Sequence, residues 1–101
     1  MSLPSLPPTH VPWSPNIRNT FRDLNEHFST CHAYLQGGGL DKHRLKQHTN
    51  MFMAEVFPMI LILDEYAAEE NLPLQWLEEI SNRCLEVFYL LDERLKAAYE
   101  E

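Results

Sequence analysis

The fold is decided by residues 51–63, which read MFMAEVFPMILIL and are apolar around most of a helix. At about 100° per residue, one side of that helix carries most of the apolar side chains, and Met51 and Ile62 sit almost opposite them. The core side is predicted to hold Phe52, Val56, Met59, Ile60 and Leu63, with Met53, Phe57 and Leu61 on its flanks. Such a helix must be covered on more than one side, so we expect it to be the central helix of a bundle.

This central helix is predicted to run from about residue 42 to about residue 70. Asp41 precedes it as a natural N-cap, and Asn71, Leu72 and Pro73 follow it as a reversal. Pro58 lies inside it, where its ring removes one backbone hydrogen bond and clashes with the preceding turn. We therefore predict that the helix kinks or breaks near residues 55–57.

Two amphipathic helices flank the central one. The first begins with Ser14 as N-cap and Pro15 at the first helical position, and it ends at the glycines 37–39. The third runs from about residue 73 to the end of the chain. Their core positions are predicted to be Ile17, Phe21, Leu24, Phe28, Cys31 and Leu35 in the first, and Leu77, Ile80, Cys84, Val87, Phe88, Leu91 and Leu95 in the third.

These elements predict an all-α domain, an antiparallel up-down-up three-helix bundle with a Pro-kinked central helix over residues 14–101. Residues 1–13 form a proline-rich N-terminal arm, which the prolines at 4, 7, 8 and 12 keep extended. Leu6, Val11 and Trp13 are apolar for a free linker, so either the arm or another chain covers the far face of the central helix. The third helix keeps its pattern to the last residue, which fits a module of a larger protein.

Composition narrows the classes of partner. The formal net charge of −7 argues against binding to nucleic acid or to anionic membranes, because a surface that binds either needs a surplus of Lys and Arg. Proteins are therefore the expected class of partner. The apolar segment is shorter than the roughly 20 residues of a membrane-spanning helix and contains Glu55 and Pro58. Cys31 and Cys84 fall within apolar stripes, where reduced thiols normally lie, and the N-terminus does not resemble a signal peptide. We expect an acidic intracellular protein, cytoplasmic or nuclear.

One alternative is a small zinc-stabilised helical domain. His27 and Cys31 are four residues apart on the first helix, and His48 is predicted to lie level with His27 on the second. Cys31, however, belongs to the core stripe, and the chain has no CxxC element. Ordinary histidines at the edge of the core explain the same residues without a metal.

A second alternative rests on residues 22–27, RDLNEH, which fit R-x4-H with a polar residue after the arginine. This resembles the motif of HEPN-type ribonucleases, all-helical enzymes that act on RNA without a metal at a dimer interface. The resemblance covers six residues and implies Arg22 as the phosphate-stabilising group and His27 as acid or base. Its place on the first helix and the acidic net charge depart from the usual arrangement of that family.

The reading that we favour is a non-enzymatic domain for protein–protein interaction or homo-oligomerisation, with a homodimer as the expected state. No catalytic residue, cofactor or metal ligand is assigned. The residues expected at the interface are Trp13, Met51, Glu55, Pro58 and Ile62, with Tyr66 and Tyr89 at its rim.

Overall fold

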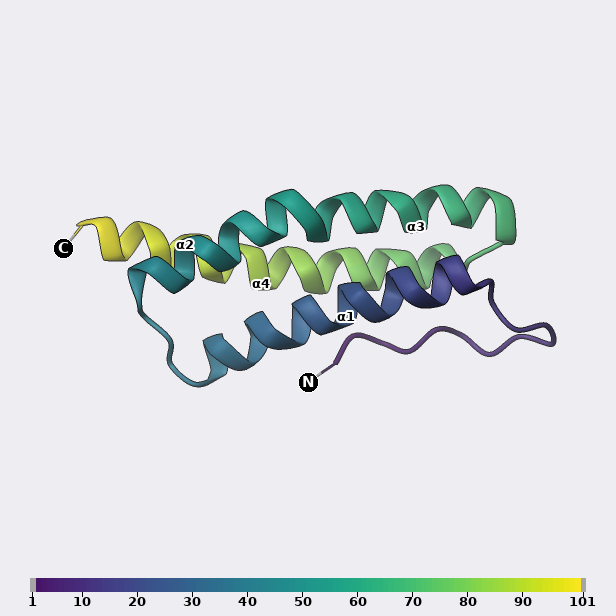
Figure 1. Cartoon of the computed structure of the whole chain (residues 1–101), viewed down its shortest axis with the longest axis horizontal. Helices are drawn as coiled ribbons and strands as arrows, with labels where there is room; N and C mark the ends of the chain where they lie inside the picture. The colour runs from purple at the N-terminus through teal and green to yellow at the C-terminus, as the bar shows by residue number, and fades with distance from the viewer. Residues whose placement is uncertain (1, 101) are drawn as a thin grey trace.

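The computed structural model describes residues 2–100 and forms an elongated helical bundle of 53 × 21 × 21 Å. Its helices are α1 (Pro15–Gln36), α2 (Lys42–Met51), α3 (Phe57–Glu70) and α4 (Leu74–Glu100), and the π-helical turn η1 (Phe52–Val56) joins α2 to α3. Figure 1 shows α1 running from right to left, α2, η1 and α3 returning as one continuous rod, and α4 running from right to left again. The predicted all-α three-helix bundle is confirmed.

The helix ends follow the predicted capping residues. The Ser14 hydroxyl accepts a hydrogen bond from the Ile17 N–H at 3.3 Å, and the Asp41 carboxylate accepts one from the Arg44 N–H at 3.0 Å. Gly38 has a φ of 76°, a value that side chains disfavour, so the reversal after α1 needs a glycine there. Asn71 ends α3 with a φ of 59° in the left-handed region, which asparagine tolerates better than most residues.

The central rod changes its hydrogen bonding just before Pro58. The Phe57 N–H bonds to the Phe52 carbonyl, five residues earlier instead of four, which defines η1. In a regular α-helix the Pro58 ring would press on the Ala54 carbonyl, and a wider turn relieves that clash. The predicted break in α-helical bonding is therefore present as a π-helical turn, while a bend of the rod at Pro58 stays a prediction.

The core follows the predicted stripes closely. Phe21, Phe88 and Leu95 are half-buried, and the remaining predicted core residues of α1 and α4 are buried. Along the central rod, α2 packs mainly against α4, whereas α3 packs mainly against α1. The buried residues of the rod are Leu45, Thr49, Phe52, Val56, Ile60 and Leu63.

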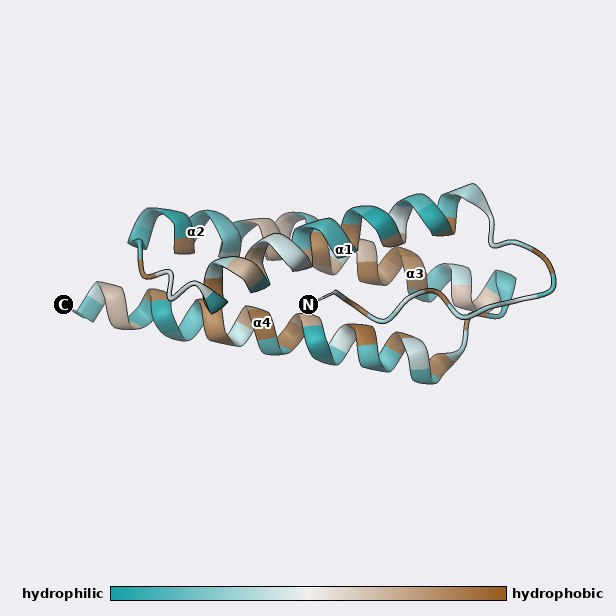
Figure 2. Cartoon of the chain, turned by 90° about the horizontal axis from the view of Figure 1, so that it is seen from below, coloured by the Kyte–Doolittle hydropathy of each residue, from teal (hydrophilic) through white to brown (hydrophobic). Residues whose placement is uncertain are grey.

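The N-terminal arm lies over the groove between α1 and α4, with its start about midway along the bundle (Figure 2). The Leu3 side chain is only 3% exposed, and its N–H donates to the Asn25 side chain of α1 at 2.9 Å. From α4, the Trp76 indole N–H donates to the Pro4 and Ser5 carbonyls at 3.2 and 2.9 Å. Hydrogen bonds hold the arm on α1 and α4, and residues 9–13 line a hollow with Glu70 and Asn71 at the end of α3. The arm therefore does not cover the middle of the far face of the central rod.

Within residues 2–100, no helix combines the length and apolar character needed to cross a membrane.

Candidate protein interface

One side of the bundle, where η1 and α3 lie beside α4, exposes a group of large apolar side chains. Phe57 and Phe88 meet edge to face with their ring centroids 5.1 Å apart, and Tyr89 lies 6.0 Å from Phe88. Met53 and Leu61 lie four residues before and after Phe57, on the same stripe of the rod. We call Met53, Phe57, Leu61, Phe88 and Tyr89 the α3–α4 face.

The α3–α4 face combines a packed base with an exposed rim. Phe57 and Phe88 are half-buried, and Phe57 also contacts the fully buried Phe52 at 6.0 Å between centroids. Met53, Leu61 and Tyr89 are 61%, 63% and 62% exposed. An aromatic base held rigid by the core, with apolar side chains standing above it, is typical of protein interfaces.

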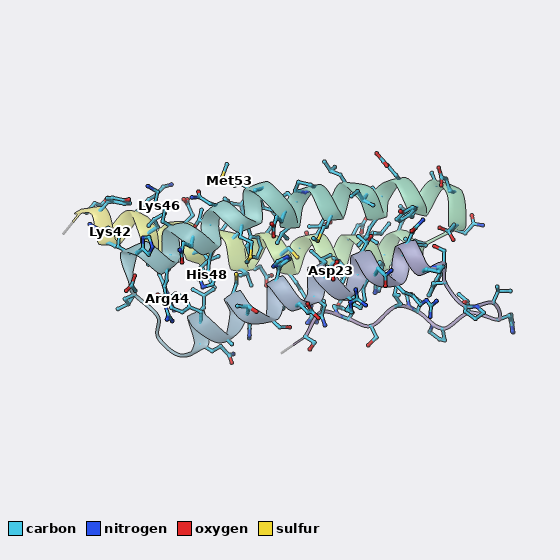
Figure 3. All side chains as sticks on the ribbon, viewed as in Figure 1. Asp23, Lys42, Arg44, Lys46, His48 and Met53 are labelled. Atoms are coloured by element: carbon cyan, nitrogen blue, oxygen red, sulfur yellow. The ribbon has the colours of Figure 1, made fainter. Side chains whose placement is uncertain are left out.

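Charged residues of opposite sign lie at the two ends of the same rod. The start of α2 carries Lys42, Arg44 and Lys46, all exposed, and Figure 3 shows Lys46 and Met53 projecting on the same outer side. The last half of α3 carries exposed Asp64, Glu65 and Glu69. The rod therefore presents a basic end, an apolar middle and an acidic end.

The predicted interface residues occupy different places in the structure. Pro58 is exposed, Ile62 is 38% exposed, and both lie on the outer side of α3 beside the α3–α4 face. Tyr89 is part of that face, whereas Tyr66 is half-buried against the core. Their role at an interface stays a prediction.

The other three predicted residues make contacts within the chain. The Trp13 indole N–H donates to the Pro7 carbonyl at 2.7 Å and stabilises the arm. Glu55 is exposed and pairs with His27 of α1 at 3.1 Å. The far-face placement of Met51 is wrong, because this side chain is half-buried against the core. The prediction assumed 100° per residue throughout, and η1 begins at the next residue.

The sequence analysis did not predict that residues of α3 and α4 together form the α3–α4 face. Met53, Phe57 and Leu61 were predicted as flanks of the core, and Phe88 as core. Their spacing of four residues along one rod was a visible signal. The spacing does not indicate which residues of α4 lie beside that stripe, because this depends on how the helices pack.

The proposed zinc ligands are only partly brought together. The Cys31 sulfur lies 3.4 Å from Nδ1 of His48, but His27 faces Glu55 instead. Across residues 2–100, no group of three or more His, Cys, Asp or Glu side chains could hold a metal ion. A zinc-stabilised domain built on His27, Cys31 and His48 is therefore not supported by this geometry.

Both thiols are protonated at neutral pH. Burial raises the pKa of Cys31 and of Cys84 to about 12, and the nearby Cys31 contributes to the rise at Cys84. Because the thiolate is the nucleophile, these buried cysteines are inert core residues in this fold. Burial also lowers the pKa of His48, with a smaller contribution from Arg44, so the neutral ring is favoured beside the Cys31 thiol.

The two residues of the ribonuclease-like motif have different partners. Arg22 is largely exposed and contacts Asp23 beside it at 3.5 Å, whereas His27 contacts Glu55 of η1. Positions five apart on an α-helix point about 140° away from each other. Within one chain, the helix therefore separates the two side chains, and the ribonuclease activity stays an untested prediction.

No known protein-family model matches the chain, and comparisons with curated proteins and with solved structures likewise find no match.

Proposed function

We propose that this chain is a non-enzymatic helical module that binds protein and that pairs with a second copy of itself. The observation that carries the proposal is the α3–α4 face, where three large apolar side chains are more than half exposed above a rigid aromatic base. Covering them removes apolar surface from water, which stabilises an assembly by about 25 cal/mol per Å². An exposed apolar cluster of this kind is typical of an interaction site.

The charges on the rod favour a second copy as the partner. When the two-fold axis is perpendicular to the rods, the rods run antiparallel, so the basic start of α2 in one copy lies opposite the acidic end of α3 in the other. The middle of the rod, around Pro58, then lies near the two-fold axis. Ala54 and Pro58 are small and exposed there, so two rods can approach closely. Both copies contribute the same patch, which is what a closed dimer requires.

Sedimentation equilibrium over micromolar concentrations tests the pairing. Leu61→Glu and Ile62→Glu each place a carboxylate in the middle of the interface, and we expect either to weaken dimerisation by at least about 100-fold while helical content is kept. The matched control is Leu40→Glu, since Leu40 is 69% exposed against 63% for Leu61 but lies in the loop after α1. A monomer at high micromolar concentration would refute self-association.

A charge exchange tests the antiparallel arrangement separately. Lys46→Glu should weaken the dimer because it removes an attraction to the acidic end of α3, and adding Glu69→Lys should restore part of the loss. If the double variant dimerises no better than Lys46→Glu alone, this orientation would be ruled out.

A further inference from the structure

The groove between α1 and α4 extends beyond the segment covered by the arm. Figure 2 shows α1 and α4 continuing past the arm, and no other part of residues 2–100 lies over them there. The uncovered part is an open hollow of about 640 Å³. On α1 it begins at Phe28, three residues after Asn25, and on α4 its lining runs from Gln75, next to Trp76, to Leu90. Covered and open parts therefore form one continuous groove.

The covered half shows how this groove holds an extended chain. One apolar side chain, Leu3, is buried, and the backbone on either side of it is held by Asn25 from α1 and Trp76 from α4. The arm has no regular secondary structure, so its backbone groups need such side-chain partners. In the open half, the polar side chains of His32 from α1 and Asn82 from α4 line the two walls, and Leu90, 46% exposed, offers an apolar contact.

The open half is acidic. Glu78, Glu79 and Glu86 line it together with one guanidinium, that of Arg83, which already donates to Glu79 at 3.1 Å. Three carboxylates against one engaged cation leave an excess of negative charge at the rim, in a chain whose net charge is −7. A ligand with Lys or Arg side chains would complement it, and an acidic one would be repelled.

We propose that the open half of the α1–α4 groove binds an extended, basic and apolar peptide segment of another protein, in line with the N-terminal arm. Gln75 and Leu90, the lining residues of α4 furthest apart in sequence, are separated by about 22 Å along the helix. An extended chain spans that length with about seven residues. This site uses Glu86, Val87 and Leu90 of α4, whereas the α3–α4 face uses Phe88 and Tyr89, so it does not rest on the proposed dimer.

Fluorescence anisotropy of the full chain with a labelled peptide tests the site. The probe is a peptide of about seven residues in which lysine and leucine alternate around a central proline, which prevents a helical conformation. We expect saturable binding that weakens with added salt, and no binding of the counterpart in which every lysine is glutamate. Failure of the basic peptide to saturate, or equal binding of both peptides, would overturn the proposal.

Two Glu→Lys substitutions distinguish binding in the groove from general attraction of a basic peptide to an acidic protein. Glu86→Lys should weaken binding by about tenfold, and Glu93→Lys, two turns further along the same side of α4 and outside the groove, by less than about twofold. Equal losses in the two variants would mean nonspecific attraction and would overturn the site.

Two further readouts complete the test. Leu90→Ser, which leaves the charges unchanged, should weaken binding by about threefold or more, and an unchanged affinity would contradict the apolar contact. Circular dichroism of each variant checks that the fold is kept. If Glu86→Lys has a lower helical content than wild type, the peptide affinity of Leu90→Ser is the test of the site instead. If Glu86→Lys abolished self-association while the peptide failed to bind wild-type protein, the occupant would be a second copy and the proposal would fail.

Discussion

Deletion of Ala54 should leave the fold intact, because η1 contains one residue more than an α-helical turn. Ala54 is exposed and lies within the loop closed by the Phe57 N–H and the Phe52 carbonyl. Removing it brings these two groups to the spacing of four that an α-helix uses. Ile60 and Leu63 then keep their orientation toward the core. A regular turn would also press the Pro58 ring on the Met53 carbonyl, so the deletion is made in a Pro58→Ala background. Relative to Pro58→Ala alone, we expect the free energy of unfolding to change by no more than about 1 kcal/mol.

The matched control is deletion of Asn82, an exposed residue in the uninterrupted helix α4. In a regular helix, loss of one residue turns everything after it by about 100°. Val87 and Leu91, which are 4% and 0% exposed, would then leave the core. Each contributes about 1.5–3 kcal/mol by burial, so this deletion should cost at least about 3 kcal/mol, a large part of the 5–15 kcal/mol typical of a small domain.

Urea unfolding followed by far-ultraviolet circular dichroism compares the two deletions at one protein concentration. The expected order is the Pro58→Ala protein close to its Ala54 deletion, with the Asn82 deletion in the same background far less stable or unfolded. Equal losses for the two deletions would refute the reasoning, since η1 would then not act as a single-residue insertion.

Two further predictions concern the arm and the half-buried His48. Leu3→Ala removes the buried side chain that anchors the arm, at a cost of about 2 kcal/mol or more in the free energy of unfolding. It should shift Trp76 fluorescence to the red and leave the helical content unchanged. The control Val11→Ala, at an exposed position, should cause no shift. No shift in Leu3→Ala would show that the arm is held by other contacts. Because burial lowers the pKa of His48, the unfolded state takes up its proton first, so this residue makes stability fall as the pH drops below about 6.5. Thermal unfolding across pH should show a shallower acid loss for His48→Gln than for wild type, and equal slopes would contradict the assignment.

Local sequence signals predicted the helices well. Ser14 and Asp41 cap the helices that they were expected to cap, and Gly38 and Asn71 adopt the left-handed conformations of the two reversals. These features depend on a few neighbouring residues, so a short stretch contains the information. The buried stripes of α1 and α4 follow for the same reason, since a regular helix repeats every 3.6 residues.

Prediction of the candidate site was weaker because it depends on contacts between distant segments. The outer position of Ile62 followed from the helical angle, but the position of Met51 did not, since η1 changes that angle. The aromatic pair of Phe57 and Phe88 joins residues far apart in the chain, and no periodicity within one helix relates them.

The sequence by itself determined which segments are helical, where they end and which stripes are apolar, because hydrogen bonding and capping within a helix are local. Only the tertiary structure decided where the N-terminal arm lies, which side chains stand exposed beside α4, and that the groove between α1 and α4 stays open beyond Leu3. Those features follow from the free energy of burying one surface against another. That free energy depends on the shapes of all three helices together.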